Sequence, residues 1–210
     1  MKYIFLLLLA FLTFSPAQAD AVWFSSSWNY KVKVEVNPNK VGTTTAVTSM
    51  PVYNDCGGFP TTFWTNASST GADIRVVESD DTTETAFELV SFSTTSKTCE
   101  LHFMADSLGT TSTSTFYIYY GNATATAYAV TDTYGRNNVW TAYRAIYHMN
   151  SLTTDYSGNS RTLSNINTVG SATQFLGTSA DFTPNDTLEI NNSFVNSFPV
   201  VITGWINPDI

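Results

Sequence analysis

The chain has 210 residues and a formal net charge of −8, and only 12% of its residues are charged. Such a chain lacks the basic surface that neutralises phosphates, which argues against nucleic acid as a partner. Hydrophobic residues make up 43% and aromatic residues 14% of the chain, which is ample material for a core and excludes a disordered chain. With Thr, Ser and Asn between the apolar residues, the composition is typical of an extracellular all-β protein.

Residues 1–19 have the pattern of a secretory signal peptide. Lys2 supplies a positive charge, residues 4–14 are apolar apart from Thr13, and residues 17–19 read Ala-Gln-Ala, a small-x-small cleavage site. The apolar run is shorter than the roughly 20 residues that a membrane-spanning helix needs, and no later segment approaches that length. We therefore expect a chain that is exported to the periplasm, the cell surface or the medium, without a membrane span in its mature part.

Alternating apolar and polar residues mark the first predicted strand, at 31–36. Val32, Val34 and Val36 share one face, and charged residues occupy the other. The sequence Asn-Pro-Asn at 37–39 ends this strand, because proline has no backbone N–H for the ladder. Further strands are predicted at 50–53, 73–77, 86–92, 99–104 and 115–120. Their spacing predicts an antiparallel, jelly-roll-like β-sandwich.

Cys56 and Cys99 are the only cysteines, and both lie beside predicted strands. In an exported chain we expect them to form a disulfide, which would restrict the unfolded chain by about 3 to 4 kcal/mol. The alternative is a pair of buried thiols. A zinc site would need histidines at suitable spacing, which these two cysteines lack.

Glu78, Asp80 and Glu84 are the candidates for a glycosidase carboxylate pair. A retaining enzyme needs two carboxyl groups about 5 to 5.5 Å apart. Residues 81–83 have the composition of a hairpin turn, so the three side chains are not expected to converge. The nucleophile motif Gly-x-Ser-x-Gly does not occur in the sequence either. We therefore expect a protein without enzymatic activity and keep a glycoside hydrolase as the lesser alternative.

The strand predicted at 115–120 raises the question of ligand contact. One face is expected in the core and carries Phe116, Ile118 and Tyr120. The opposite face carries Tyr117 and Tyr119, whose rings either pack within the sandwich or stack against the flat faces of sugars.

Oxygen-bearing side chains of the kind that calcium prefers occur late in the chain, at Asp155, Asn185 and Asp186. Their spacing matches no EF-hand loop, and Asp and Asn are also common turn formers. Calcium binding and turn formation therefore stay as two alternatives for these residues, and no other cofactor is expected. His102 and His148 lack metal-like neighbours and are expected to be packed or half exposed.

A change in the sequence pattern near Trp140 predicts a domain boundary, where the series of strands gives way to short polar loops. We expect a first module at 20–140 and a second at 144–210. Helical periodicity is weak throughout, and the best helix candidate is 139–147. The last segment, 198–210, alternates like a core strand.

The chain contains, in order, WNYKVKVEV, FPTTFW, GADIRV, AFELVSF, ELHF, FYIYYGN and VWTAYRAIYHMN, the last of which crosses the predicted boundary. Over residues 28–140 this ordered set resembles the exported β-sandwich family catalogued as domain of unknown function 2341. The second module contains YHMN, DYSGNSRTL, ADF, LEI and ITGWI. It resembles the opening of a laminin-G or concanavalin A-like lectin module, truncated because fewer residues remain than such a module needs.

The resemblance implies a surface protein in which the sandwich stands ahead of a lectin-like module, with a glycan or another surface protein as partner. Cys56 and Cys99 stand where the family has other residues, and a disulfide particular to this chain explains both changes. We therefore expect an exported, non-catalytic module that acts in adhesion or carbohydrate binding, with Tyr117 and Tyr119 as candidate contacts. The alternative is a structural component of a surface layer, appendage or particle.

Overall fold

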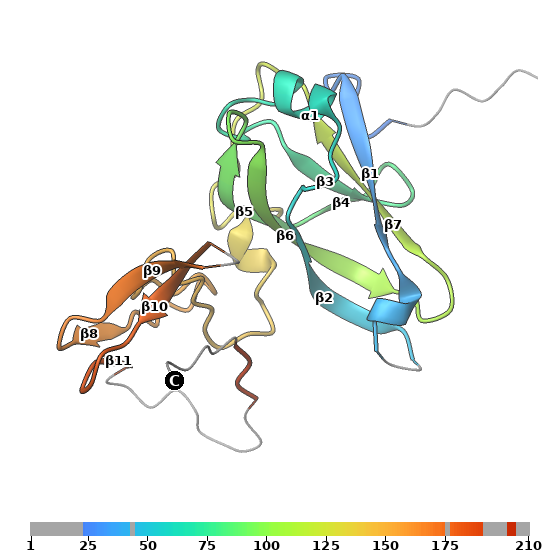
Figure 1. Ribbon diagram of the computed structural model, residues 1–210. Coiled ribbons are helices and arrows are strands. Elements are labelled where there is room, and N and C mark those ends of the chain that lie inside the picture. Colours follow the sequence, from blue (N-terminus) through green and yellow to red (C-terminus); the bar gives the residue numbers. More distant parts are fainter. Residues whose placement is uncertain (1–22, 43–44, 175–176, 191–200, 205–210) are drawn as a thin grey trace, which may run out of the picture.

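Two antiparallel β-sheets face each other in the computed structural model, which describes residues 23–42, 45–174, 177–190 and 201–204. A group of shorter strands follows in the chain and lies beside this sandwich (Figure 1). Helix is almost absent from the described residues. The predicted all-β sandwich is therefore confirmed.

The first sheet has β7 at its centre. Its strands, in spatial order, are β1 (Tyr30–Val36), β7 (Ser114–Tyr120), β3 (Arg75–Glu78) and β4 (Glu84–Thr85). Ile118 of β7 lies opposite Val32 on one side and Val76 on the other. Because side chains alternate between the faces of a strand, this register places three β-branched residues in one row that faces the second sheet.

The second sheet has β6 at its centre. Its strands, in spatial order, are β2 (Val47–Asn54), β6 (Thr98–Leu108) and β5 (Phe87–Ser93). The strand β2 contains Pro51, and Ser49 has a φ of 53°. Proline and an irregular backbone are features that discourage an edge strand from pairing with another chain.

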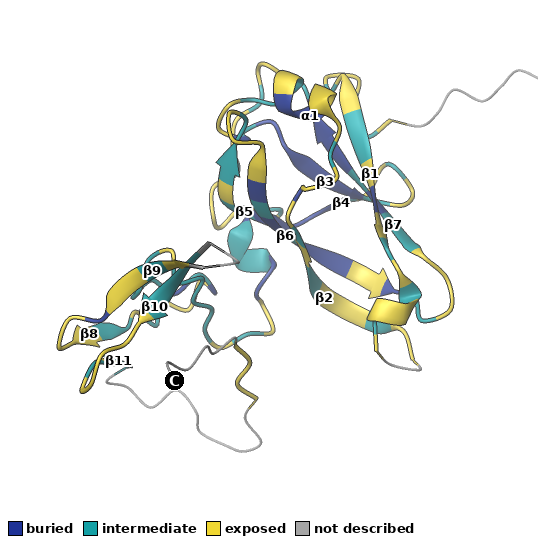
Figure 2. Ribbon diagram, in the orientation of Figure 1, coloured by how far each residue is buried: buried dark blue, intermediate teal, exposed yellow. Residues whose placement is uncertain are grey.

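The core lies between the two sheets and is built from the apolar faces that the alternation predicts. Phe116, Ile118 and Tyr120 are at most 2% exposed, which confirms their predicted place. Opposite them, Phe103 of β6 is fully buried. In Figure 2, β3 and parts of β6 and β7 are dark blue, the colour of buried residues. Burial of each large apolar side chain contributes about 1.5 to 3 kcal/mol.

The chain passes from the first sheet to the second at Ala86, between β4 and β5. On one side of this crossing, the Thr85 hydroxyl donates to the carbonyl of Met104 across 2.5 Å. At the crossing itself, the backbone N–H of Met104 donates to the carbonyl of Ala86 across 2.9 Å. These bonds connect β4 to the central strand of the second sheet and close one side of the sandwich.

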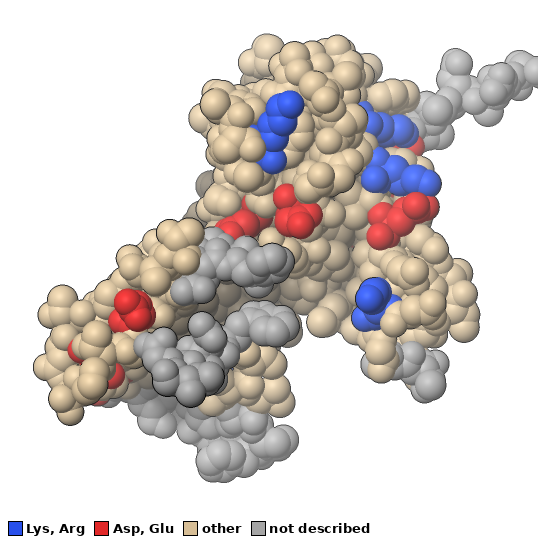
Figure 3. All heavy atoms as spheres, in the orientation of Figure 1, with Lys and Arg blue, Asp and Glu red and all other residues tan. Residues whose placement is uncertain are grey.

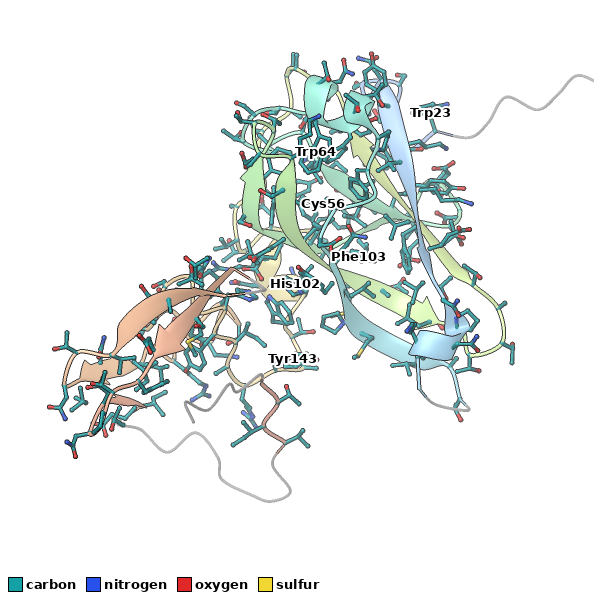
Figure 4. The ribbon with its side chains drawn as sticks, in the orientation of Figure 1. Trp23, Cys56, Trp64, His102, Phe103 and Tyr143 are labelled. Atoms are coloured by element: carbon teal, nitrogen blue, oxygen red, sulfur yellow. A yellow bond between two sulfur atoms is a disulfide. The ribbon has the colours of Figure 1, made fainter. Side chains whose placement is uncertain are left out.

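Cys56 and Cys99 form a disulfide, as predicted. Their Cα atoms are 5.7 Å apart, and the residues are 1% and 4% exposed. In Figure 4, Cys56 lies inside the sandwich with Trp64 and Phe103. The bond closes a loop across a sequence separation of 43, for which the loop-entropy relation gives about 3 to 4 kcal/mol of stabilisation.

The helices differ from the sequence prediction. The short helix α1 (Thr61–Asn66) was missed, and it places Phe63 and Trp64 in the core. The helix predicted at 139–147 is wrong: only a 3-10 turn, η2 (Arg136–Asn138), precedes it, and the segment itself runs through turns. The missed helix and the wrongly predicted helix have the same cause. The conformation of both segments is set by their contacts with the sheets, which helical periodicity in the sequence does not report.

A third layer covers the outer face of the second sheet. Val139 and Trp140 are buried against Ala86 and Met104, and together they form a small second core. Tyr143 and Ile146 pack against the same cluster. The segment that was predicted as a helix therefore serves as a cover for the sheet.

Beyond this cover lie two short antiparallel pairs. The strands are β8 (Ser164–Ile166) with β11 (Thr187–Glu189), and β9 (Gly170–Gln174) with β10 (Gly177–Asp181). The Asn165 side chain holds the turn between β8 and β9, because its Oδ1 accepts from the Val169 N–H at 2.8 Å. The assignment of this part to a concanavalin-like module stays a prediction.

The strand predicted at 198–210 falls largely outside the described residues. Within 201–204 the backbone forms no strand. Val201 and Ile202 are 85% and 92% exposed, so this described piece is not part of a core.

The 3-10 turn η1 (Pro38–Lys40) ends β1 at the point that the sequence predicts. Asn37 caps it, with Oδ1 accepting from the backbone N–H of Asn39 at 2.9 Å. Proline fixes the backbone for the turn and cannot continue the ladder, so the strand stops.

Candidate functional site: an aromatic surface around Lys31

The outer face of the first sheet carries a cluster of aromatic and charged side chains, which we call the Lys31 surface. It consists of Trp23, Lys31, Asp81, Tyr117 and Tyr119. Lys31 of β1 lies directly opposite Tyr119 of β7 in the ladder, and Tyr117 is two residues away on the same face. Asp81 comes from the turn between β3 and β4, and Trp23 from the segment before β1.

The amino group of Lys31 is surrounded by rings. Its Nζ lies 4.5 Å from the ring centroid of Tyr117, 4.9 Å from that of Trp23 and 5.6 Å from that of Tyr119. It also forms an ion pair with Asp81. Burial alone would lower the pKa of the Lys31 amine, but the hydrogen bond to Asp81 and the charges nearby raise it above the ordinary value. The group is therefore a cation held between π-faces.

Tyr119 is fully buried in this cluster. The rings of Trp23 and Phe24 lie over it, at centroid distances of 5.4 and 5.7 Å. Its hydroxyl donates to Asp81 across 2.6 Å and accepts from the backbone N–H of Phe24 across 3.1 Å. Burial, followed by the hydrogen bond to Asp81, raises the pKa of this phenol. Of the two predicted contact tyrosines, Tyr119 therefore anchors the segment that covers it.

Tyr117 and Trp23 are the aromatic residues of this surface that a ligand can reach. Trp23 is 41% exposed, and Tyr117 is half-buried. Trp23 stands outside the sandwich in Figure 4. Next to them, Lys33 and Glu35 form an ion pair of 2.8 Å in which both side chains are about half exposed. Figure 3 shows basic and acidic side chains side by side on the flank over β1.

Sequence reasoning found Tyr117 but missed Trp23, because Trp23 precedes the first predicted strand and belongs to no alternating pattern. One sequence feature could have identified Trp23: it is a tryptophan within a few residues of the expected mature N-terminus. The arrangement offers flat apolar faces beside an ammonium and a carboxylate. The aromatic faces complement the C–H faces of sugars, and the ammonium and carboxylate complement sugar hydroxyl groups.

Glu78 and Glu84, two of the three carboxylates of the glycosidase hypothesis, lie on opposite faces of the first sheet. Val77 lies opposite Glu84 in the ladder, so these two share a face of the first sheet, and Glu78 points to the other face. Glu84 lies 3.6 Å from Arg75 Nε and accepts from the Tyr128 hydroxyl at 3.1 Å. Glu78 and Glu84 therefore cannot provide the close carboxyl pair that a retaining glycosidase uses.

Asp80 holds the turn that follows β3. It accepts from the hydroxyl and the backbone N–H of Thr83 and from the N–H of Thr82, and these bonds lower the pKa of its carboxyl to about 2. Glu78 and Asp80 also line an open hollow of about 300 Å³ together with Asp106. Burial, and the charges of Asp106 and Asp80, raise the pKa of Glu78. The hollow is acidic, without an aromatic platform of its own.

The predicted calcium ligands serve as turn formers. Asp155 accepts from the backbone N–H groups of Ile146, Ser157 and Arg161, at 2.9 to 3.0 Å. Burial would raise the pKa of Asp155, but these hydrogen bonds lower it.

Asn185 has a φ of 78° in the turn before β11, and Asp186 accepts from the backbone N–H of Thr183 at 2.8 Å. Within the described part of the chain, three or more His, Cys, Asp or Glu side chains nowhere gather in a metal-binding group.

The two histidines, far apart in the sequence, are brought together. The rings of His102 and His148 stack at 5.2 Å, and His148 Nε2 lies 2.9 Å from a carboxylate oxygen of Glu88. The sequence predicted packed histidines but gave Glu88 no role. A signal was present in AFELVSF, where a charged residue stands between two large apolar residues of a strand.

No protein-family model, curated protein or solved structure matches this chain. Across the residues that the structure describes, no helix has the length and apolar character needed to cross a bilayer. Function is therefore inferred from the geometry of this chain's own residues.

Proposed function

We propose that the protein is an exported, non-catalytic module that binds carbohydrate through the Lys31 surface and so acts in adhesion. The observation that carries this proposal is the contact of the Lys31 ammonium with the rings of both Trp23 and Tyr117, at 4.9 and 4.5 Å from their centroids. Two reachable rings beside one cation offer both stacking and hydrogen bonding to one sugar unit. The signal-peptide pattern at 1–19 and the resemblance to exported surface modules support the same proposal.

The rings are held in place before any ligand arrives. Trp23 packs edge-on against Tyr119, whose hydroxyl is itself bonded to Asp81 and Phe24. A preformed site loses less conformational entropy on binding than a flexible one. We expect weak binding to a single sugar, with a dissociation constant of the order of 1 mM, strengthened where a polymer engages several copies.

The test is binding of the exported chain to a glycan array and to insoluble cell-wall polysaccharides. We expect Trp23→Ala and Tyr117→Ala each to weaken binding at least about tenfold, the loss of one ring contact being worth about 1.4 kcal/mol. The matched control is Tyr53→Ala, because Tyr53 is 44% exposed but lies on the second sheet. Circular dichroism of each variant checks that the sandwich is intact.

Absence of binding to every glycan and polymer tested would contradict the proposal. Binding that survives both ring variants would also contradict it, because the contact would then lie elsewhere. Concentration-dependent self-assembly without glycan binding would favour the alternative, a structural component of a surface layer, appendage or particle. N-terminal sequencing of the secreted protein checks the export step, and Asp20 is the expected first residue.

A further inference from the structure

The outer face of the second sheet carries a second cluster, separate from the Lys31 surface, which we call the clasp. It consists of Glu88, His102, Trp140, His148 and Tyr156. Two of its members, Glu88 and His102, are direct neighbours in the ladder of β5 and β6. The other three come from the chain that runs over this sheet after η2. In Figure 4, His102 lies on the side of the sandwich that faces the short strands.

Glu88 is the anchor of the clasp. Its side chain is 4% exposed, and one carboxylate oxygen accepts from the indole N–H of Trp140 at 2.6 Å and lies 2.9 Å from His148 Nε2. Arg136 Nε lies 4.0 Å from the other oxygen. All three partners belong to the covering segment. Because a buried carboxylate without partners is strongly unfavourable, the segment and the carboxylate stabilise each other.

His102 lies at the centre of a group of rings. Its ring centroid is 5.1 Å from that of Trp140 and 5.2 Å from those of Tyr53 and His148. The His148 ring lies in turn 4.8 Å from that of Tyr156. A proton on His102 would therefore place a charge among closely packed rings and directly against a second imidazole.

We propose that the clasp is acid-sensitive: proton uptake by His102 releases residues 136–161 from the second sheet, while the disulfide-linked sandwich stays folded. The clasp thus sets how firmly the second part of the chain is held against the first. This proposal stands apart from carbohydrate binding, because it concerns the opposite sheet.

The direction follows from proton linkage. Burial, and then the neighbouring His148, lower the pKa of His102 from 6.5 to about 4. Once the segment leaves, His102 regains solvent and its ordinary pKa, so the open state binds the proton more tightly. The closed state is therefore favoured most above pH 6.5, and the closed-to-open ratio falls by roughly 160-fold as the pH drops to about 4.

Two further ionisable groups around the clasp, Tyr53 and Asp155, keep their charge state across this pH range. Burial, followed by the charges of Glu100 and Asp55, raises the pKa of Tyr53, so Tyr53 stays neutral across this range. The guanidinium of Arg136 lies 5.0 Å from the Tyr156 ring centroid. Asp155, whose pKa is lowered by backbone hydrogen bonds, stays ionised and continues to hold the turn at Ile146.

Opening is expected to be local. The covering segment rests on a small apolar cluster, whereas the main core is large and is crossed by the Cys56–Cys99 bond. Both histidines of the chain belong to the clasp, so the main core has no histidine to titrate. Segments with few buried contacts open first, at free energies below that of global unfolding.

The test is hydrogen exchange of the oxidised protein at about pH 7 and about pH 4.5, corrected for intrinsic exchange rates and read by peptide. We expect protection of residues 136–161 to fall at least about tenfold at the lower pH, while peptides from β1 and β7 keep theirs. Proton NMR of the imidazole rings gives the two histidine pKa values directly, because the chain has only two histidines.

The decisive variant is His102→Gln, which removes the titrating group and is expected to abolish most of the pH dependence. The matched control is Glu78→Gln, which removes a carboxyl of raised pKa from the first sheet and should leave the clasp unchanged. Unchanged protection of 136–161 at low pH would overturn the proposal. Equal loss of protection in β7, or an undiminished pH response in His102→Gln, would overturn it as well.

Discussion

The indole N–H of Trp140 donates to the buried carboxylate of Glu88 across 2.6 Å and joins two residues 52 positions apart in the chain. Trp140 therefore packs against the second sheet of the sandwich, although the sequence pattern changes at this residue.

Replacement of the Trp140 indole tests how much its hydrogen bond to Glu88 contributes to stability. We expect Trp140→Phe to lower the free energy of unfolding by about 1 to 3 kcal/mol, because a buried carboxylate loses a hydrogen bond while ring packing is largely kept. Urea titration followed by circular dichroism measures the effect. Trp23→Phe is the control, with an expected change below about 1 kcal/mol at a more exposed site. Equal effects of the two variants would contradict the role of the Glu88 bond.

The disulfide is expected to contribute strongly to stability. The double variant Cys56→Ala/Cys99→Ala should lose about 2 to 5 kcal/mol, since its unfolded chain regains the freedom of the closed loop. Chemical denaturation of the variant and of the reduced wild type should give similar midpoints. A variant as stable as the oxidised wild type would show that the bond is unimportant for folding.

Tyr119 should affect ligand binding without touching the ligand. In Tyr119→Phe, Asp81 loses a donor and the Phe24 N–H loses an acceptor, so the segment that carries Trp23 is held less firmly. We expect a loss of stability of about 1 to 2 kcal/mol and weaker glycan binding. Isothermal titration should show a more unfavourable entropy of binding, because Trp23 must now be ordered. Unchanged affinity would contradict this positioning role.

Asp155 gives a pH prediction of the same sign as that of the clasp, but at more acid pH. Its pKa is below the ordinary value in the folded protein, so its contribution is complete above the unfolded pKa of 3.8 and is lost as the pH falls through the folded pKa. We expect Asp155→Asn to be less stable than the wild type at pH 7 by about 1 to 3 kcal/mol. The difference between the two proteins should shrink in strong acid.

Unfolding curves at several pH values measure this contribution of Asp155. Asp186→Asn is a suitable control, because Asp186 also accepts from a turn backbone N–H but is less buried. A difference for Asp155→Asn that is independent of pH would contradict the assignment.

The strands of the sandwich were predictable because their residues obey a local rule. In β1, the alternation of Val32, Val34 and Val36 matches a ladder that faces the core. Phe116 and Ile118 of β7 were placed correctly for the same reason. A two-residue period is sufficient to assign the faces of a strand, whatever lies opposite.

The sites depended on contacts that no local pattern contains. Tyr119 is buried by Phe24, whose N–H reaches it across a separation of 95 residues. His148 meets Glu88 from 60 residues away. The helix predicted at 139–147 failed because Val139 and Trp140 are fixed by the sheet below them. In each case the sequence supplied the residue types, and tertiary packing decided their partners.

The Cys56–Cys99 bond has a mechanical consequence for the proposed role in adhesion. A pull on the two ends of the chain cannot lengthen the stretch between these residues, because the bridge carries the tension past it. A sequence separation of 43 would otherwise add about 150 Å of extended length. The α1 helix and the strands β3 to β5 lie within this shielded stretch, so they bear no direct load even when the flanking strands are drawn apart.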